Sequence, residues 1–394
     1  MNDPVLVVGA GLSALRTAES MRKSGYGGPI RVIGEEEHPP YNRPPLSKQA
    51  LSGGIALEEL AFPLRASISD VEWTLGVKVV SSDLRSRTLT TNDGATAPFS
   101  GLVIASGIRS RQLPIPGPQT GRIFLRTIED AHHLRDRLSA GVRLLILGSG
   151  FIGCEVAATA RGLGCEVDIV SLDSEPMIRP LGADLGAGMR EHHEQHGVRF
   201  HLGRTITEFT GKDQVSGALL DDGTHLEADL VLEAVGSVAN TEWLEGNDLD
   251  LSNGVLTDGY LSVVDSPVPA VAVGDVARHP NALFPGETMR IEHWNMPTDM
   301  GKRAGSTLAS LIAGEPAAGK PFDALPSFWS DQYDQNLQSF GIPGAATGYE
   351  IVEGSYRGDC IVEYHDSSGV IGVIGVNRTA ELLPYRKKLL ARHS

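Results

Sequence analysis

The sequence has few cysteines, no long apolar run and no excess of positive charge. The three cysteines among its 394 residues, Cys154, Cys165 and Cys360, form no C-x-x-C pair. They therefore predict no disulfide framework, and they cannot supply the four thiolates of an iron–sulfur cluster. No apolar run approaches the length that spans a bilayer, and an apolar strand begins already at residue 5, so we expect no membrane contact and no signal peptide. Such a chain suits the reducing cytoplasm.

The charge balance is acidic. Asp and Glu number 49 against 34 Lys and Arg, a net charge of −15, which argues against nucleic-acid binding but allows a local basic patch for an acidic partner. With 41% apolar residues and 46 glycines, the composition favours an α/β protein, and the length favours two or three domains.

The segment 4–48 carries a nucleotide-binding pattern. An apolar strand at 5–8 runs into G-x-G-x-x-A, formed by Gly9, Gly11 and Ala14, and then into a helix. The first glycine permits the tight turn, the second lets the backbone approach a pyrophosphate, and Ala14 lets the helix pack close to the strand. A second strand at 30–33 leads to Glu35, whose carboxylate can bind a ribose hydroxyl pair. The sequence predicts a dinucleotide site here.

The same unit recurs 139 residues later. A strand at 143–147 precedes GSGFIG, in which Gly148, Gly150 and Gly153 repeat the fingerprint, and a helix follows. Two such units imply two dinucleotides, or one cofactor and one dinucleotide substrate. The next strand, 166–170, ends at Ser171, where a carboxylate would be expected, and Asp173 and Arg179 lie beyond it.

Other stretches allow two interpretations each. The proline-rich loop 39–48 is either a plain surface loop or a rigid support for a phosphate contact from Arg43 and a flavin contact from Lys48. Gly274 and Asp275 end an apolar strand, and we expect a helix after them. The segment 328–333 is expected to be a polar loop whose aromatics either fill the core or line a cofactor edge or docking face.

Three histidines, His192, His193 and His196, form H-H-x-x-H on a polar helix. Metal binding is conceivable because the first and last share a helix face, but no third ligand is evident in the sequence. We favour a solvated helix face here and at the pair 132–133, and we predict no metal site.

By its motifs the chain resembles the FAD-dependent ferredoxin reductases of bacterial oxygenase systems, of the putidaredoxin reductase and aromatic-ring dioxygenase reductase type, with apoptosis-inducing factor as a more distant relative. The motifs occur in the family's order: PPYNRPPLSK, LVIASG, FLRTIEDA, GSGFIGCEVA, AVGD, EHW and FWSDQY. The resemblance implies a glutathione-reductase-like α/β fold with two Rossmann-type domains and a small C-terminal α/β domain. The FAD domain would be split into 1–107 and 243–318, around an NAD(P) domain at 108–242, with the last domain at 319–394.

The resemblance also implies site residues. Those expected to contact FAD are Gly9, Gly11, Ala14, Glu35, Arg43, Lys48, Val80, Ala105, Ser106, Arg126, Gly274, Asp275, Trp294 and Trp329. Those expected to contact NADH or NADPH are Gly148, Gly150, Phe151, Ile152, Glu155, Ser171, Asp173, Arg179 and Gly236. Lys48 and Glu155 would form an ion pair near the reacting flavin atom and act in hydride transfer. Ser171 replaces the family's common Glu, so we expect NADPH to be accepted beside NADH.

The implied function is electron transfer. FAD would take hydride from NAD(P)H and pass electrons singly to a [2Fe-2S] ferredoxin that feeds an oxygenase, a Rieske aromatic-ring dioxygenase in preference to a cytochrome P450. The cations expected to dock the ferredoxin are Lys302, Arg303, Arg386, Lys387 and Lys388. Two alternatives stay open. A flavin NADH oxidase or disulfide reductase would need a reactive cysteine beside the flavin, and none precedes Cys154. A non-turnover NADH-binding signalling flavoprotein would show no sustained ferredoxin reduction.

Overall fold

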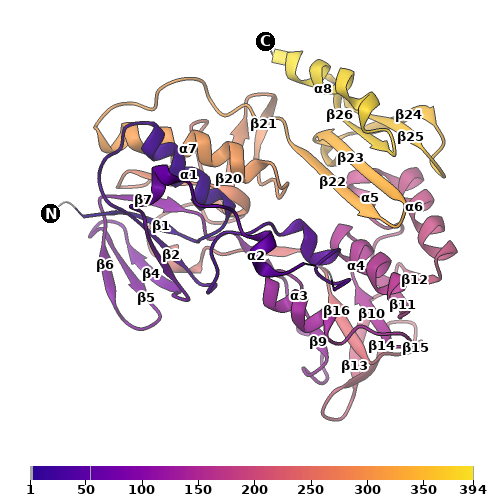
Figure 1. Ribbon diagram of the computed structural model, residues 1–394. Helices are drawn as coiled ribbons and strands as arrows, with labels where there is room; N and C mark the ends of the chain where they lie inside the picture. The colour runs from indigo at the N-terminus through magenta and orange to yellow at the C-terminus, as the bar shows by residue number, and fades with distance from the viewer. Residues whose placement is uncertain (1–2, 54, 394) are drawn as a thin grey trace.

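A computed structural model describes residues 3–53 and 55–393 (Figure 1). Its first sheet is parallel and has the strand order β19-β7-β1-β2-β3. These strands span Ala270–Ala272, Gly101–Ile104, Val5–Val8, Ile30–Gly34 and Glu72–Leu75. The strands β1, β7 and β19 are fully buried apolar runs, as parallel sheets covered on both faces require, whereas the edge strand β3 is partly exposed. The sheet therefore joins the start of the chain to a strand that arrives after residue 269.

Two helices from these distant segments pack on each other. They are α1 (Leu12–Lys23) and α7 (Met296–Ile312), drawn in indigo and orange in Figure 1. Gly305 makes the contact possible, because a Cβ there would lie 2.6 Å from the carbonyl oxygen of Thr17. Close packing of α7 on α1 thus holds the first glycine turn, which precedes α1, against the later segment that contains β19 and α7.

The second sheet repeats the first in its topology. Its strand order is β12-β11-β10-β16-β9, and all its pairs are parallel. The strands span Val198–Leu202, Glu166–Ser171, Arg143–Leu147, Leu230–Glu233 and Arg122–Ile123. The helices of this part are α3 (Ile128–Arg135), α4 (Phe151–Gly162), α5 (Ile178–Leu181) and α6 (Ala183–Gln195). The repeated strand–turn–helix unit predicted at 143–163 is therefore present.

A third large sheet is antiparallel and has the order β22-β23-β26-β25-β24. Its strands span Ser327–Gln332, Gln335–Gly341, Gly369–Val376, Cys360–Asp366 and Gly348–Gly354, and α8 (Leu383–Leu390) follows them. The expectation of a polar loop at 328–333 was wrong, because all of these residues except Tyr333 belong to β22. Ser330 and Gln332 are buried on its inner face although they are polar, whereas Trp329 points outward and is 37% exposed.

Smaller elements complete the chain. They are α2 (Leu57–Leu60), β4 (Val79–Asp83), β5 (Thr88–Thr91), β6 (Thr96–Pro98), β8 (Ile108–Ser110), β13 (Ile206–Gly211), β14 (Val215–Leu220), β15 (His225–Glu227), β17 (Ser237–Ala239), β18 (Val255–Leu256), β20 (Ala277–Asn281) and β21 (Phe284–Met289). Among the described residues no helix is long and apolar enough to cross a membrane. The domain limits stay a proposal, at 1–107 with 243–318, 108–242 and 319–394.

The helix expected after Asp275 is absent. A single 3-10 turn, Gly274–Val276, leads directly into β20, which pairs with β21. Pro280 explains the difference, because its ring and missing N–H exclude a helix interior. The following helix begins at Met296, and Pro297 occupies its first turn as proline commonly does.

Candidate functional site

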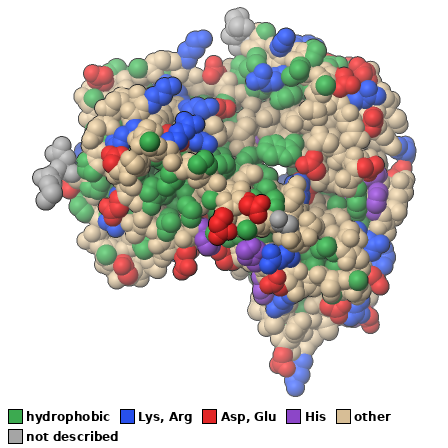
Figure 2. Space-filling view, in the orientation of Figure 1, with side chains coloured by type: hydrophobic (Ala, Val, Ile, Leu, Met, Phe, Trp, Pro, Cys, Tyr) green, Lys and Arg blue, Asp and Glu red, His purple; other side chains and the backbone are tan. Residues whose placement is uncertain are grey.

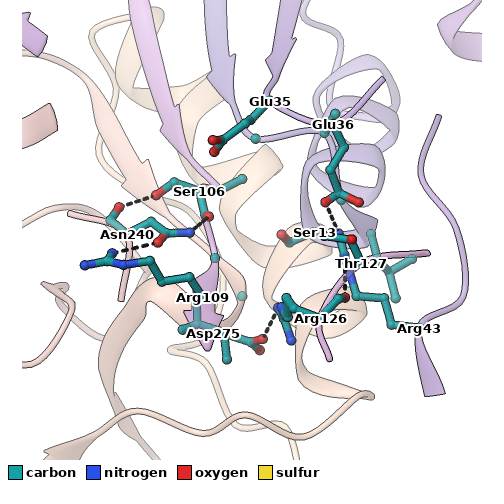
Figure 3. A pocket seen from close by; sticks show the side chains of 18 of the residues that line it. Ser13, Glu35, Glu36, Arg43, Ser106, Arg109, Arg126, Thr127, Asn240 and Asp275 are labelled. Atoms are coloured by element: carbon teal, nitrogen blue, oxygen red, sulfur yellow. Dashed lines mark hydrogen bonds and ion pairs between the residues drawn. The ribbon is translucent and has the colours of Figure 1, made fainter. Parts of the chain in front are cut away.

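A cavity of about 790 Å³ opens where the carboxyl ends of β1, β7 and β19 meet, the edge at which α/β sheets bind ligands (Figure 3). Ten of the predicted FAD residues line it: Gly9, Gly11, Glu35, Arg43, Ala105, Ser106, Arg126, Gly274, Asp275 and Trp294. Ala14 is buried in α1 behind the turn. Three predicted residues, Lys48, Val80 and Trp329, do not belong to this lining.

The first glycine turn is shaped for close approach of a ligand. Gly9 has φ +104°, and a Cβ there would lie 2.1 Å from the carbonyl oxygen of Ala105, so a side chain is excluded. Gly11 precedes α1, and a Cβ on it would meet nothing within 4 Å. The N–H groups of the first helical turn therefore face open space, which suits a pyrophosphate.

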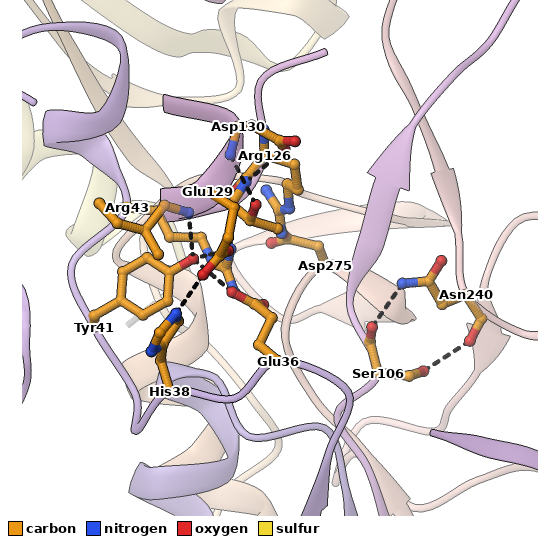
Figure 4. Close-up of polar contacts among 12 residues, drawn as sticks. Glu36, His38, Tyr41, Arg43, Ser106, Arg126, Glu129, Asp130, Asn240 and Asp275 are labelled. Atoms are coloured by element: carbon orange, nitrogen blue, oxygen red, sulfur yellow. Dashed lines mark hydrogen bonds and ion pairs between the residues drawn. The ribbon is translucent and has the colours of Figure 1, made fainter. Parts of the chain in front are cut away.

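Charged side chains from three segments meet on one side of the cavity (Figure 4). Arg43 lies 2.5 Å from a carboxylate oxygen of Glu36 and donates a 2.8 Å hydrogen bond to the carbonyl oxygen of Arg126. Tyr41 donates to the other oxygen of Glu36 at 2.6 Å. These contacts fix the proline-rich loop against the start of α3 and hold the Arg43 guanidinium at the cavity wall.

Asp275 and Arg126 form a second ion pair at the cavity wall. Asp275 Oδ2 lies 3.1 Å from Nη2 of Arg126, and both residues line the cavity. Burial raises the pKa of the Asp275 carboxyl, and the Arg126 guanidinium opposes that rise. A carboxylate on the cavity wall accepts hydrogen bonds, so the position suits a hydroxyl or N–H donor on a ligand.

Two reciprocal hydrogen bonds link Ser106, which follows β7, to Asn240, which follows β17. Ser106 Oγ donates to the Asn240 carbonyl at 2.7 Å, and Asn240 Nδ2 donates to the Ser106 carbonyl at 2.9 Å (Figures 3 and 4). The Ser106 hydroxyl is thus engaged within the protein. Glu35 lies at the cavity edge and forms an exposed ion pair with Lys78 at 2.9 Å.

The predicted ion pair between Lys48 and Glu155 is present. Lys48 Nζ lies 2.6 Å from Glu155 Oε2, and the Glu155 residue is only 6% exposed. Ser47 Oγ donates to the same carboxylate oxygen at 2.5 Å, and Ser330 Oγ donates to Oε1 at 2.6 Å. A buried carboxylate needs such partners, and here they come from the proline-rich loop and from β22.

The second glycine turn has the same geometry as the first. Gly148 has φ +105°, and a Cβ there would lie 2.3 Å from the carbonyl oxygen of Ala234. Gly150 immediately precedes α4, which begins with Phe151 and the 46% exposed Ile152. The predicted residue Gly236 follows β16 in a turn with φ +93°. These positions surround the N-terminal end of α4.

Ser171 ends β11 with its hydroxyl turned inward. Its Oγ accepts hydrogen bonds from Ser149 Oγ at 2.8 Å and from the backbone N–H of Asp173 at 3.2 Å. Arg179 lies exposed in α5. The arginine whose backbone contacts Ser171 is Arg204, whose side chain pairs with Asp222 at 3.0 Å. The Arg204 guanidinium is thus engaged with acidic side chains, and only its backbone contacts the end of β11.

Three residues at or near the site were not predicted from the sequence. Glu36 stands beside the predicted Glu35 and binds Arg43, while Arg109 donates to the Asn240 side chain at 2.9 Å. Ser330 braces Glu155 from a distant strand. Glu36 could have been recognised from the sequence, because it is a second acidic residue directly after β2. No sequence pattern around Ser330 indicates its contact with Glu155.

The three cysteines are free and buried. Burial raises the pKa of the Cys154 thiol, which donates to the Ser149 carbonyl at 3.5 Å, and none of the three lines the described cavity. A buried thiol of raised pKa is a poor nucleophile. This arrangement gives no support to the disulfide reductase alternative.

The residues of the first cavity fit an adenine dinucleotide such as FAD. They supply an N-terminal helix turn and Arg43 for phosphates, carboxylates for hydroxyl groups, and an aromatic side chain, Trp294, on the wall. The volume lies within the range of cofactor cavities. A smaller mononucleotide would leave part of this set without a ligand.

Comparison with known proteins agrees with this fit. The sequence profile of the pyridine nucleotide-disulphide oxidoreductases matches residues 3–301, and that of the reductase C-terminal domain matches residues 327–394. The ferredoxin–NAD(+) reductase component of the p-cumate 2,3-dioxygenase system of Pseudomonas putida is 34% identical over 99% of this chain and 94% of its own length.

Solved structures give the same result. The covalent putidaredoxin reductase–putidaredoxin complex matches with a TM-score of 0.90 and 29% identity over 99% of this chain and 94% of that one. The ferredoxin reductase for the CYP199A2 system from Rhodopseudomonas palustris matches with a TM-score of 0.90 and 34% identity over 100% of this chain and 96% of that one. Proteins of this family use FAD and NAD(H). The chain belongs to the pyridine nucleotide-disulphide oxidoreductases, among the ferredoxin–NAD(+) reductases of bacterial oxygenase systems.

Proposed function

We propose that this protein is an FAD-containing NADH-dependent ferredoxin reductase that supplies electrons to an oxygenase system. The observation that carries the proposal is the dinucleotide cavity together with the Lys48–Glu155 pair, which joins the FAD side to the helix of the second glycine turn. When bound, FAD accepts a hydride from NADH and releases two electrons one at a time, which a one-electron iron–sulfur acceptor needs.

The chain's residues divide the work. We assign the first glycine turn, Arg43 and Asp275 to holding FAD, with Val80 and Trp329 as outer contacts. We assign Gly148, Gly150 and the start of α4 to the nicotinamide nucleotide. Lys48 supplies a fixed positive charge at the reacting end, and its pairing with Glu155 keeps that charge oriented.

Nucleotide choice rests on the end of β11. A carboxylate there would bind the ribose hydroxyls of NADH and repel the 2′-phosphate of NADPH. Ser171 lacks that charge, so we propose that NADPH is accepted although NADH is preferred.

The ferredoxin docks on a basic hollow beside the C-terminal sheet. A second cavity of about 710 Å³ is lined by four cations, Lys302, Arg303, Lys320 and Arg386. Basic side chains gather on this face where Figure 1 draws α7 and α8 (Figure 2). The charge suits an acidic ferredoxin although the whole chain is acidic. Arg303 also has a structural role. Its guanidinium carbon lies 4.7 Å from the ring centroid of Tyr260, and it donates a hydrogen bond to the Ala318 carbonyl at 2.7 Å.

We propose a Rieske aromatic-ring dioxygenase as the terminal oxygenase, in line with the relative from the p-cumate 2,3-dioxygenase system. A cytochrome P450 is the alternative, in line with the similar reductase of the CYP199A2 system. We propose the cytoplasm as the compartment of this protein, where NADH is available and where three free cysteines stay reduced. The test is reduction of a [2Fe-2S] ferredoxin by NADH with catalytic amounts of the purified flavoprotein. Sustained turnover is expected, and a single stoichiometric reduction of the flavin would favour the signalling alternative.

A further inference from the structure

His192 of α6, His196 at the C-terminal cap of that helix and Asp334 from the β22–β23 turn lie close together. His192, His196 and Asp334 each offer a ligand atom, and these atoms lie within 4.8 Å of one another. His192 Nε2 is 3.0 Å from Asp334 Oδ1. The two histidines are one helical turn apart, so both rings project from the same face of α6. The third ligand, which the sequence alone did not reveal, comes from a different sheet.

The surroundings prepare the second ring for metal binding. His196 Nδ1 lies 2.9 Å from the carbonyl oxygen of His192, a contact that places the proton on Nδ1 and leaves the Nε2 lone pair free. Metal-binding histidines are commonly oriented in this way by a backbone carbonyl. The ring also stacks on Tyr333, with 3.8 Å between ring centroids and 13° between planes. Its orientation is therefore held on two sides.

The middle histidine of the motif has a different partner. His193 is fully buried, and its Nε2 lies 2.7 Å from the side-chain oxygen of Gln332. It anchors α6 to β22 and takes no part in the surface cluster. The motif H-H-x-x-H thus separates into one structural histidine, His193, and two histidines that lie beside Asp334, of which His192 is partly buried and His196 exposed.

We infer that His192, His196 and Asp334 form a binding site for a divalent transition-metal ion of the Zn²⁺ type. Two imidazoles and one carboxylate suit Zn²⁺, Ni²⁺ or Cu²⁺, whereas Mg²⁺ and Ca²⁺ prefer sites made of oxygen ligands. Ligands of a tetrahedral zinc ion lie about 3.3 Å apart, which small side-chain rotations can reach, because His196 and Asp334 are exposed. Water completes the coordination, because the site is open to solvent.

The site links two parts of the molecule. α6 packs with the second sheet, and the turn that carries Asp334 joins β22 to β23 of the C-terminal sheet. An ion held by both would tie them together and raise the thermal stability of the folded protein by mass action. The same strand β22 carries Ser330, the hydrogen-bond donor to Glu155.

The test uses full-length, FAD-loaded protein without a histidine tag, titrated with Zn²⁺ by isothermal calorimetry. We expect one Zn²⁺ per chain bound at this site, a higher melting temperature with Zn²⁺, and no such effects with Mg²⁺. The double variant His192→Gln/His196→Gln should weaken binding at least about 100-fold, and Asp334→Asn, an exposed near-isosteric change, at least about tenfold. The control His132→Gln/His133→Gln removes the same number of histidines and should bind like the wild type.

Folding is checked by the flavin absorbance of each variant. If wild-type protein binds no Zn²⁺, or if the folded His192→Gln/His196→Gln and Asp334→Asn variants bind Zn²⁺ as tightly as the wild type, the site does not exist. Because these readouts are independent of turnover, they also separate failure of this site from failure of the proposed reductase activity.

Discussion

Lys48 Nζ lies 2.6 Å from Glu155 Oε2, and this ion pair spans from the proline-rich loop to the helix after the second glycine turn. Ser47 and Ser330 each donate a hydrogen bond to the Glu155 carboxylate, so the ion pair is both buried and oriented. A carboxylate held in this way keeps its cation in one position. The pair thus connects the proline-rich loop after the first fingerprint to the helix of the second, although the two lie far apart in the sequence.

The first prediction concerns that cation. Lys48→Ala removes the positive charge near the reacting end and should slow reduction of bound FAD by NADH about 10- to 100-fold. Stopped-flow absorbance under anaerobic conditions measures the rate, and the released flavin measures FAD content, which should stay close to one per chain. Lys212→Ala, an exposed lysine elsewhere, is the control. An unchanged reduction rate would refute the catalytic role of Lys48.

The second prediction compares two glycines with positive φ. Gly9→Ala should destabilise the protein and lower its FAD content, because the new Cβ would lie 2.1 Å from a carbonyl oxygen. Gly25 has φ +87° but open space around it, so Gly25→Ala should cost only about 1 kcal/mol of backbone strain. The clash should add at least about 1–3 kcal/mol at position 9. Denaturant unfolding with a flavin assay gives both values, and equal losses in the two variants would contradict the predicted close approach.

The third prediction concerns nucleotide choice. Wild-type protein should use NADPH measurably, with NADH preferred. Ser171→Glu places a carboxylate at the end of β11 and should lower kcat/KM for NADPH about tenfold or more, which corresponds to about 1.4 kcal/mol of repulsion. Steady-state kinetics with both nucleotides provide the test. If the NADPH value does not change, the specificity is set by other residues.

The fourth prediction concerns ferredoxin docking. Lys302→Glu/Arg386→Glu reverses two exposed charges at the basic hollow and should raise the KM for ferredoxin about tenfold and flatten its salt dependence. Ferricyanide reduction should stay normal, because a small acceptor needs no docking face. Lys212→Glu adds the same kind of charge away from the hollow. Ferredoxin kinetics equal to those of this control would place the docking face elsewhere.

The fifth prediction concerns pH. His279 is fully buried on β20, and burial lowers the pKa of its imidazole below the ordinary 6.5. Below pH 6.5 the unfolded state takes up a proton that folded His279 refuses, so the free energy of unfolding should fall as the pH is lowered, by up to about 1.4 kcal/mol per pH unit from this group. His279→Gln should reduce that slope, and His133→Gln, at an exposed position, should keep it. Identical slopes in all three proteins would contradict this assignment.

Local patterns predicted both nucleotide-binding units because strand, glycine turn and helix are adjacent in the chain. Gly9 and Gly148 could be assigned from spacing alone, and the structure gives both the positive φ and the close carbonyl contact expected of such turns. Contacts between distant segments could not be obtained in this way. The approach of Asp334 to His192 depends on how a hairpin of one sheet meets a helix of another.

The interpretation of residues 328–333 as a loop failed for a physical reason. A strand is normally recognised by apolar residues on its buried face, but here that face carries Ser330 and Gln332. Both are buried because each has a polar partner, Glu155 for the first and His193 for the second. The polar character that suggested a loop is what connects this strand to the site.

NADH-dependent reduction of a [2Fe-2S] ferredoxin is the measurement that tests the central claim most directly. Purified protein, shown by mass spectrometry to carry FAD, is mixed in catalytic amount with NADH and ferredoxin, and bleaching of the cluster absorbance is followed. The account predicts many ferredoxin molecules reduced per flavin, with sustained consumption of NADH. Reduction of the flavin without onward transfer to any of several acidic [2Fe-2S] ferredoxins would contradict it.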